Sequence, residues 1–190
     1  MIHSWIWRLK EVSMTPVERQ QKIAAYGQAY ELLAAALKHF PHEMWPYKPG
    51  PARWSIHEIL VHIADSEANS YIRCRRFIAE SGQTVMAYDE NRWADRLNYR
   101  DQNPVEAIEL FRLLRRMSYH LIKDLPEAAW ASTVDHPENG IMTMDDWLNV
   151  YANHVPEHIR HMKATHAAWL AERKGQRPDP DKSLFEFSKP

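Results

Sequence analysis

Two histidines near the end of the chain, His154 and His158, stand four positions apart. In an α-helix this spacing puts both side chains on one face, about 40° apart. Two imidazoles so placed can share one metal ion. The pair alone is weak evidence, because eleven histidines in 190 residues give roughly 0.6 such pairs by chance. From the spacing alone, a pair of solvated surface histidines is the more common interpretation.

The residues around this pair favour burial. Trp147, Tyr151 and Val155 lie near the same helix face. Buried histidines need partners, and two adjacent ones cannot both be protonated at low cost. A metal ion satisfies both requirements. His161 shares the face of His154 and is a candidate to support a ligand or replace one, although a solvated histidine fits equally well.

A third histidine, His62, lies on an earlier segment whose apolar positions predict a buried helix face. At helical spacing it belongs to a polar row beside that face, made of Glu58, His62, Ser66, Asn69 and Arg73. Such a row can face solvent, or it can line a polar pocket inside a bundle, where metal sites are built from facing helices. The helical geometry leaves both interpretations open.

Three residues lie within about 60° of the candidate ligand faces and could bind a substrate: Asn69, Arg73 and Tyr151. We expect Arg73 to hold an anionic group, although a solvated arginine without a role is at least as common. No residue is placed clearly as a general base. Glu58 belongs to a helix cap, Glu157 points about 100° away from His158, and Glu138 lies in a loop.

Four helices must position these residues, and each has a start signal at its first turn. The signals are Thr15-Pro16-Val17-Glu18, Ser55-Ile56-His57-Glu58, Asn103-Pro104-Val105-Glu106 and Thr143-Met144-Asp145-Asp146. Proline and glycine predict the ends near residue 40, near Gly82, before Pro126 and near Gly175. The sequence therefore predicts an all-α, four-helix bundle with long connections. Within one connection, residues 89–97 favour a short extra helix, and no segment predicts a sheet.

The predicted organisation is an N-terminal extension at residues 1–14, the bundle at 15–174 and a flexible tail at 175–190. Met14 stands directly before a helix signal and could be the true start. A net charge of −1 argues against nucleic acid and acidic membranes as partners. No apolar run reaches the roughly 20 residues of a membrane helix. The single cysteine, Cys74, excludes an internal disulfide and favours a cytoplasmic protein; we expect it to be a packing residue.

The sequence resembles the DinB/YfiT-like metalloprotein superfamily over about residues 15–172, in the order and separation of several short motifs. These are Trp54-Ser55, His62-Ile63-Ala64-Asp65-Ser66-Glu67, His136-Pro137-Glu138-Asn139-Gly140, and Tyr151-Ala152-Asn153-His154 with His158. Tyr88-Asp89-Glu90 followed by Trp93-Ala94 resembles the YfiT-type branch. Relatives often carry a further histidine just before the second ligand of the pair, where this chain has Glu157. Pro156 also removes a helical hydrogen bond there.

The resemblance implies a four-helix bundle with one divalent metal ion on His62, His154 and His158. It also implies metal-dependent hydrolysis, or transfer of a small thiol such as bacillithiol, mycothiol or glutathione to an electrophile, and a homodimer. Zinc and nickel both suit imidazole. Such an ion lowers the pKa of bound water toward about 7 and deprotonates a bound thiol.

The absence of a clear general base tilts the prediction toward a thiol S-transferase, with a hydrolase as the alternative. A non-catalytic, stress-associated metal-binding protein is a third possibility. A fourth protein ligand, such as His161 or a carboxylate, would favour that structural role, whereas an open coordination position favours an enzyme. A small-molecule binding module without metal ranks last.

Overall fold

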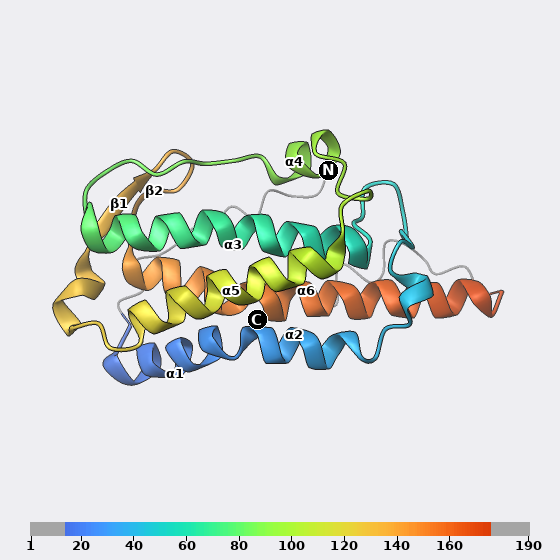
Figure 1. Cartoon of the computed structure of the whole chain (residues 1–190), viewed down its shortest axis with the longest axis horizontal. Helices are drawn as coiled ribbons and strands as arrows, with labels where there is room; N and C mark the ends of the chain where they lie inside the picture. The colour runs from blue at the N-terminus through green and yellow to red at the C-terminus, as the bar shows by residue number, and fades with distance from the viewer. Residues whose placement is uncertain (1–13, 176–190) are drawn as a thin grey trace.

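Four rows of helices run side by side along the longest axis of the molecule (Figure 1). The computed structural model describes residues 14–175. Three rows are the single helices α3 (Ile56–Ala79), α5 (Pro104–Ile122) and α6 (Met144–Arg173), and the fourth is formed by α1 (Pro16–Gly27) and α2 (Ala29–Leu37). The predicted all-α, four-helix bundle is therefore confirmed. The predicted N-terminal extension, apart from Met14, and the flexible tail beyond Gly175 lie outside the described residues.

The helices begin where the start signals predict. Thr15, Ser55 and Thr143 each complete a capping box with the acidic residue three positions on. Each box satisfies two backbone N–H groups that the first turn leaves without a helical partner. At α5 the Asn103 side chain accepts a hydrogen bond from the N–H of Val105 instead. The first turns are thus determined locally by the sequence.

The prediction of one unbroken helix up to residue 40 was wrong, because the helix is interrupted between Gly27 and Ala29. Gln28 leaves the helical conformation with a ψ of 1°. A Cβ atom at Gly27 would lie 2.6 Å from the ring of Tyr119 on α5. Glycine therefore allows the Tyr119 ring to pack directly on the backbone at the point where α1 ends.

The expectation that no segment forms a sheet was also wrong. β1 (Thr133–His136) and β2 (Gly140–Thr143) form an antiparallel hairpin. Gly140 has a φ of +71°, a left-handed conformation that glycine adopts without strain. Four residues per strand are too few to produce a recognisable alternating pattern. The hairpin leads directly into α6, so it fixes where that helix begins.

The connection between α3 and α5 crosses the outer face of α3 and contains the short helix α4 (Glu90–Arg96), as predicted (Figure 1). Its first part is held by backbone hydrogen bonds to β1, between Val85 N–H and Asp135 C=O and between Asp135 N–H and Gln83 C=O. Asp89 caps α4 by accepting from the N–H of Arg92. No residue of α4 is buried, so this helix lies on the bundle as a surface layer.

The two remaining helical turns are the 3-10 segments η1 (His42–Met44) and η2 (Glu127–Ala131). None of the helices in the described part of the chain is both long and apolar enough to cross a membrane.

The apolar core consists of two clusters that a buried ion pair separates along α3 and α5. On α3, Ile63 and Ala64 belong to one cluster and Cys74 to the other, with Glu67 between them in sequence. Arg115 on α5 forms the ion pair with Glu67, N to O at 2.5 Å, and both side chains are only 1% exposed. The core therefore has a polar level within it.

Candidate metal centre

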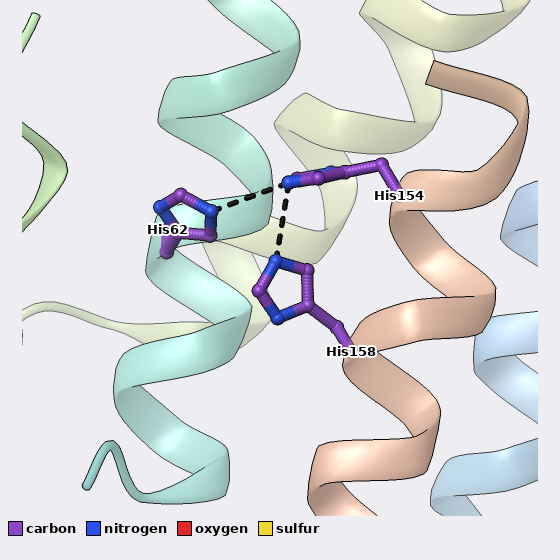
Figure 2. Close-up of side chains that lie close together, drawn as sticks. All are labelled: His62, His154 and His158. Atoms are coloured by element: carbon purple, nitrogen blue, oxygen red, sulfur yellow. Dashed lines mark hydrogen bonds between the residues drawn. The ribbon is translucent and has the colours of Figure 1, made fainter. Parts of the chain in front are cut away.

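Three histidines from two helices converge at one point of the bundle. His62 comes from α3, and His154 and His158 come from α6 (Figure 2). The Nε2 atom of His154 lies 3.3 Å from that of His62 and 3.1 Å from that of His158. Among the described residues this is the group of histidine, cysteine and carboxylate side chains whose arrangement could hold a metal ion. The sequence-predicted trio is thus brought together.

The spacing of these nitrogens fits a shared ion. In a tetrahedral site with metal–nitrogen bonds of about 2.0–2.1 Å, two ligand nitrogens lie about 3.3–3.4 Å apart. The observed separations of 3.3 and 3.1 Å match that geometry. Without a metal ion, three ring nitrogens that point at one another cannot all be satisfied by hydrogen bonds, because one proton can satisfy only one N···N pair.

The rings are also in the protonation state that metal binding needs. Burial lowers the pKa of His62 to about 3. Burial and the neighbouring histidines lower the pKa values of His154 and His158 well below the ordinary value. Neutral imidazole is the ligand form, so no proton has to be removed near neutral pH. The residues therefore fit a divalent cation.

The rings are oriented mainly by packing. The Nδ1 atoms of His62 and His158 are buried and have no hydrogen-bond partner among the described residues. The ring of Trp54 lies against His62 with centroids 4.6 Å apart. The ring of Tyr151 lies 6.1 Å from that of His154. Contacts with aromatic rings thus help to orient His62 and His154.

Pro156 lies between the two histidines of α6, yet the helix continues through it. Proline lacks the N–H that would bond the carbonyl of Ala152. One residue earlier, the carbonyl of Tyr151 accepts a hydrogen bond from Nη1 of Arg115 at 3.0 Å. The buried pair of Arg115 and Glu67 therefore ties α5 and α3 to α6 within one turn of His154.

A carboxylate that sequence reasoning missed lies next to the histidines. Oε2 of Glu90, the first residue of α4, is 3.9 Å from Nε2 of His62. Burial raises the pKa of Glu90, and the nearby carboxylates Asp89 and Glu138 add to the effect. Glu90 stood within a motif of the YfiT-type branch, but helical spacing could not connect it to His62, because it lies on a different element.

The three carboxylates weighed as bases on the sequence lie elsewhere. Glu58 completes its capping box and also pairs with Lys48 and Arg100, as the helix-cap assignment implied. Glu157 pairs with Arg160 on the outside of α6. Glu138 is exposed on the hairpin loop. Among the carboxylates of the described residues, Glu90 is therefore the one within ion-pair distance of a histidine of the cluster.

The predicted substrate residues divide into two groups. Arg73 and Tyr151 are in contact, because Nη1 of Arg73 donates to the Tyr151 hydroxyl at 3.1 Å. The Asn69 amide instead donates to the carbonyl of Asp65 on its own helix, at 2.9 Å. The structure therefore brings Arg73 and Tyr151 together on the helices α3 and α6, whereas the Asn69 amide bonds its own helix.

His161 and Cys74 have different surroundings. The His161 ring lies 5.7 Å from that of His158, so it is a neighbour of the cluster and not one of its three members.

Cys74 is fully buried in the apolar core, and burial raises the pKa of its thiol to about 12. A thiol in this state is not a nucleophile near neutral pH, which agrees with the packing role expected of Cys74.

A pocket of about 330 Å³ lies beside Trp54. It is lined by Trp54 and Glu58 from the start of the α3 region and by Asn91 and Ala94 from α4. Trp54 lines the pocket and its ring also contacts His62, whereas Glu90 and the three histidines do not line it.

The sequence matches a known protein family. The model of a family described as the DinB superfamily matches residues 25–182. A protein of Oceanobacillus iheyensis named "putative metal-dependent hydrolase" is 31% identical over 110 residues, 57% of this chain. YfiT of Bacillus subtilis, with the same description, is 28% identical over 118 residues, 62% of this chain. The matched segments span 63% and 65% of these two relatives, less than two thirds of their length.

A solved structure shares the fold. The chain superposes on YfiT from Bacillus subtilis with a TM-score of 0.76, over 90% of this chain and 94% of that one, at 22% sequence identity. That protein is described as a "probable metal-dependent hydrolase with an unusual four-helix bundle topology".

Proposed function

Because the chain belongs to the DinB superfamily, we propose that it is a metal-dependent hydrolase whose divalent ion is held by His62, His154 and His158. The observation that carries the proposal is the convergence of three neutral imidazoles, with Nε2 of His154 lying 3.3 Å from that of His62 and 3.1 Å from that of His158. The names of its relatives point to the same chemistry. Zinc and nickel are the ions that we propose, since both suit imidazole ligands.

Three neutral imidazoles are the donor set of a catalytic site, because they leave a coordination position free. An ion bound there would lower the pKa of a bound water toward about 7. We propose that Glu90, whose Oε2 atom lies 3.9 Å from Nε2 of His62, would accept a proton from such a water. The ring of Trp54 packs against that of His62, with centroids 4.6 Å apart.

Glu90 also changes the balance between hydrolysis and thiol transfer. A bound thiol needs no protein base, whereas hydrolysis usually requires a group that accepts or relays a proton. The absence of such a group favoured thiol transfer on the sequence alone. A carboxylate 3.9 Å from His62 removes that reason, so we propose hydrolysis of a small-molecule ester or amide, with transfer of a low-molecular-weight thiol as the alternative.

The same carboxylate is also the group that could close the coordination sphere. If Glu90 were a fourth ligand, the site would resemble a structural metal site, and the protein would be a non-catalytic metal-binding protein. Its side chain is one-third exposed and lies at the edge of α4. These features favour a group that exchanges protons with solvent over a fixed ligand.

Two assays on one protein sample test the function. Zinc- and nickel-loaded protein is incubated with a panel of p-nitrophenyl esters and anilides, and separately with an electrophilic dye plus bacillithiol, mycothiol or glutathione. We expect metal-dependent hydrolysis that is lost in His154→Ala. Metal-dependent conjugation with any of the three thiols, without hydrolysis, would overturn the proposal in favour of the transferase. We also propose a homodimer, which light scattering of the purified protein would test.

A further inference from the structure

Arg73 is a half-buried cation that carries no counter-charge. It lies on the same row of α3 as His62, eleven positions further along. Its two terminal nitrogens donate to neutral acceptors, the Tyr151 hydroxyl and the carbonyl of Met86. Its Nε atom is buried and has no hydrogen-bond partner among the described residues. Within residues 14–175 no carboxylate lies within ion-pair distance of it.

The lack of a carboxylate partner sets Arg73 apart from the other arginines inside the bundle. The other arginines with mainly buried side chains have carboxylates, since Arg19 pairs with Asp145 and Arg115 pairs with Glu67. A guanidinium removed from water costs free energy unless an anion or several acceptors replace the water. The charge of Arg73 is felt nearby, because after burial itself it is the largest cause that lowers the pKa of His136.

Tyr151 adds a second donor at the same place. Its side chain is buried, and its hydroxyl accepts from Arg73. A hydroxyl that accepts one hydrogen bond still has its own proton to donate. Burial raises the pKa of Tyr151, so the phenol keeps that proton near neutral pH. The guanidinium and the phenol thus present N–H and O–H donors side by side.

The pair also lies close to the histidine cluster. The Tyr151 ring is 6.1 Å from the ring of His154, and Arg73 contacts the far end of that phenol. A ligand held by Arg73 and Tyr151 would therefore lie near His154, the histidine of the cluster that contacts Tyr151. A small molecule can span that separation with a few bonds.

We infer that Arg73 and Tyr151 form a binding site for the anionic group of the substrate, a carboxylate or a phosphate, beside the histidine cluster. Guanidinium groups bind both anions through paired N–H donors. The substrate class is then a small molecule with one anionic group and, several bonds away, the bond that reacts. The inference rests on the proposed function for the position of that bond but not for the anion site itself.

The test measures anion binding directly, with acetate, methylphosphonate and neutral acetamide as probes at constant ionic strength. The Nε–H signal of Arg73 is followed by NMR and identified by its absence in Arg73→Gln, and heats of binding are measured in parallel. The titrations are repeated after metal removal by EDTA, with metal content determined on each sample. Arg76→Gln serves as the matched control, because Arg76 is on the same helix and pairs with Glu80 at the surface.

We expect both anions, and not acetamide, to shift the Arg73 signal in a saturable way, with and without metal. Arg73→Gln should weaken binding about tenfold or more, Tyr151→Phe should weaken it less, and Arg76→Gln should leave it unchanged. Arg73→Lys should recover part of the affinity. Equal shifts with acetamide, unchanged binding in Arg73→Gln, or binding that disappears with the metal would each overturn the inference. Metal-free protein that still binds anions at Arg73 would retain this site even if the metal-dependent function failed.

Discussion

The Nε2 atoms of His62 and His154 lie 3.3 Å apart although 92 positions separate the two residues in the chain. The two residues lie on different helices, so their approach depends on the packing of α3 against α6, which also brings His158 to the same point. Glu90 reaches this point from α4.

Removing the charge of Glu90 should separate its two possible roles. Glu90→Gln keeps the size of the side chain but cannot accept a proton, so hydrolysis should fall about 10²–10⁴-fold while metal content stays the same. The measurement combines turnover of a p-nitrophenyl ester with metal analysis. Glu138→Gln is the control, since it removes a neighbouring exposed carboxylate. Loss of metal in Glu90→Gln would instead identify Glu90 as a fourth ligand.

The metal-free protein should become less stable in acid. Burial holds the pKa of His62 near 3 in the folded protein, whereas the unfolded chain titrates near 6.5. Between these values the unfolded state binds more protons, so the free energy of unfolding falls as the pH falls. Well below pH 6.5, each such histidine contributes about 1.4 kcal/mol per pH unit. We therefore expect the free energy of unfolding in urea, measured between pH 7.5 and 5, to fall less steeply in His62→Gln than in the wild type. Near pH 5 the difference in slope should correspond to about one proton, and an unchanged slope would contradict the burial of a neutral His62.

Removing one partner of the buried pair of Arg115 and Glu67 should destabilise the fold strongly, whereas replacing both partners by apolar residues should not. Arg115→Met leaves an unpaired carboxylate 1% exposed, which should lower the free energy of unfolding by about 3–5 kcal/mol. The double variant Arg115→Met with Glu67→Leu removes both charges and should be much closer to wild type. Urea unfolding of the three proteins checks this. Equal losses in the single and double variants would show that the pair acts through shape and not through charge.

Much of the bundle could be predicted because its signals are local. The capping boxes at Thr15, Ser55 and Thr143 begin three helices at the expected residues. The spacing of His154 and His158 needs only one turn of helix. Their contact with His62 required the resemblance to known proteins, because helical geometry alone left the row of His62 facing either solvent or the bundle interior.

The features that were missed depend on contacts between distant segments. Glu90 reaches His62 because Val85 and Gln83 pair with Asp135, about fifty residues further along the chain. The break after Gly27 depends on the ring of Tyr119. Neither contact leaves a periodic signal in the sequence. Short strands and surface loops of this kind place functional residues by tertiary pairing, which a single sequence does not reveal.

The most direct test of the account is the metal content of the protein purified without a histidine tag. Mass spectrometry should find close to one zinc or nickel ion per chain in the wild type and a large loss in His62→Ala, His154→Ala and His158→Ala. His57→Ala should keep the metal, since Nε2 of His57 contacts the carbonyl of Gln102 instead. Circular dichroism confirms that each variant is folded. Full metal occupancy in folded His62→Ala would contradict the three-histidine site.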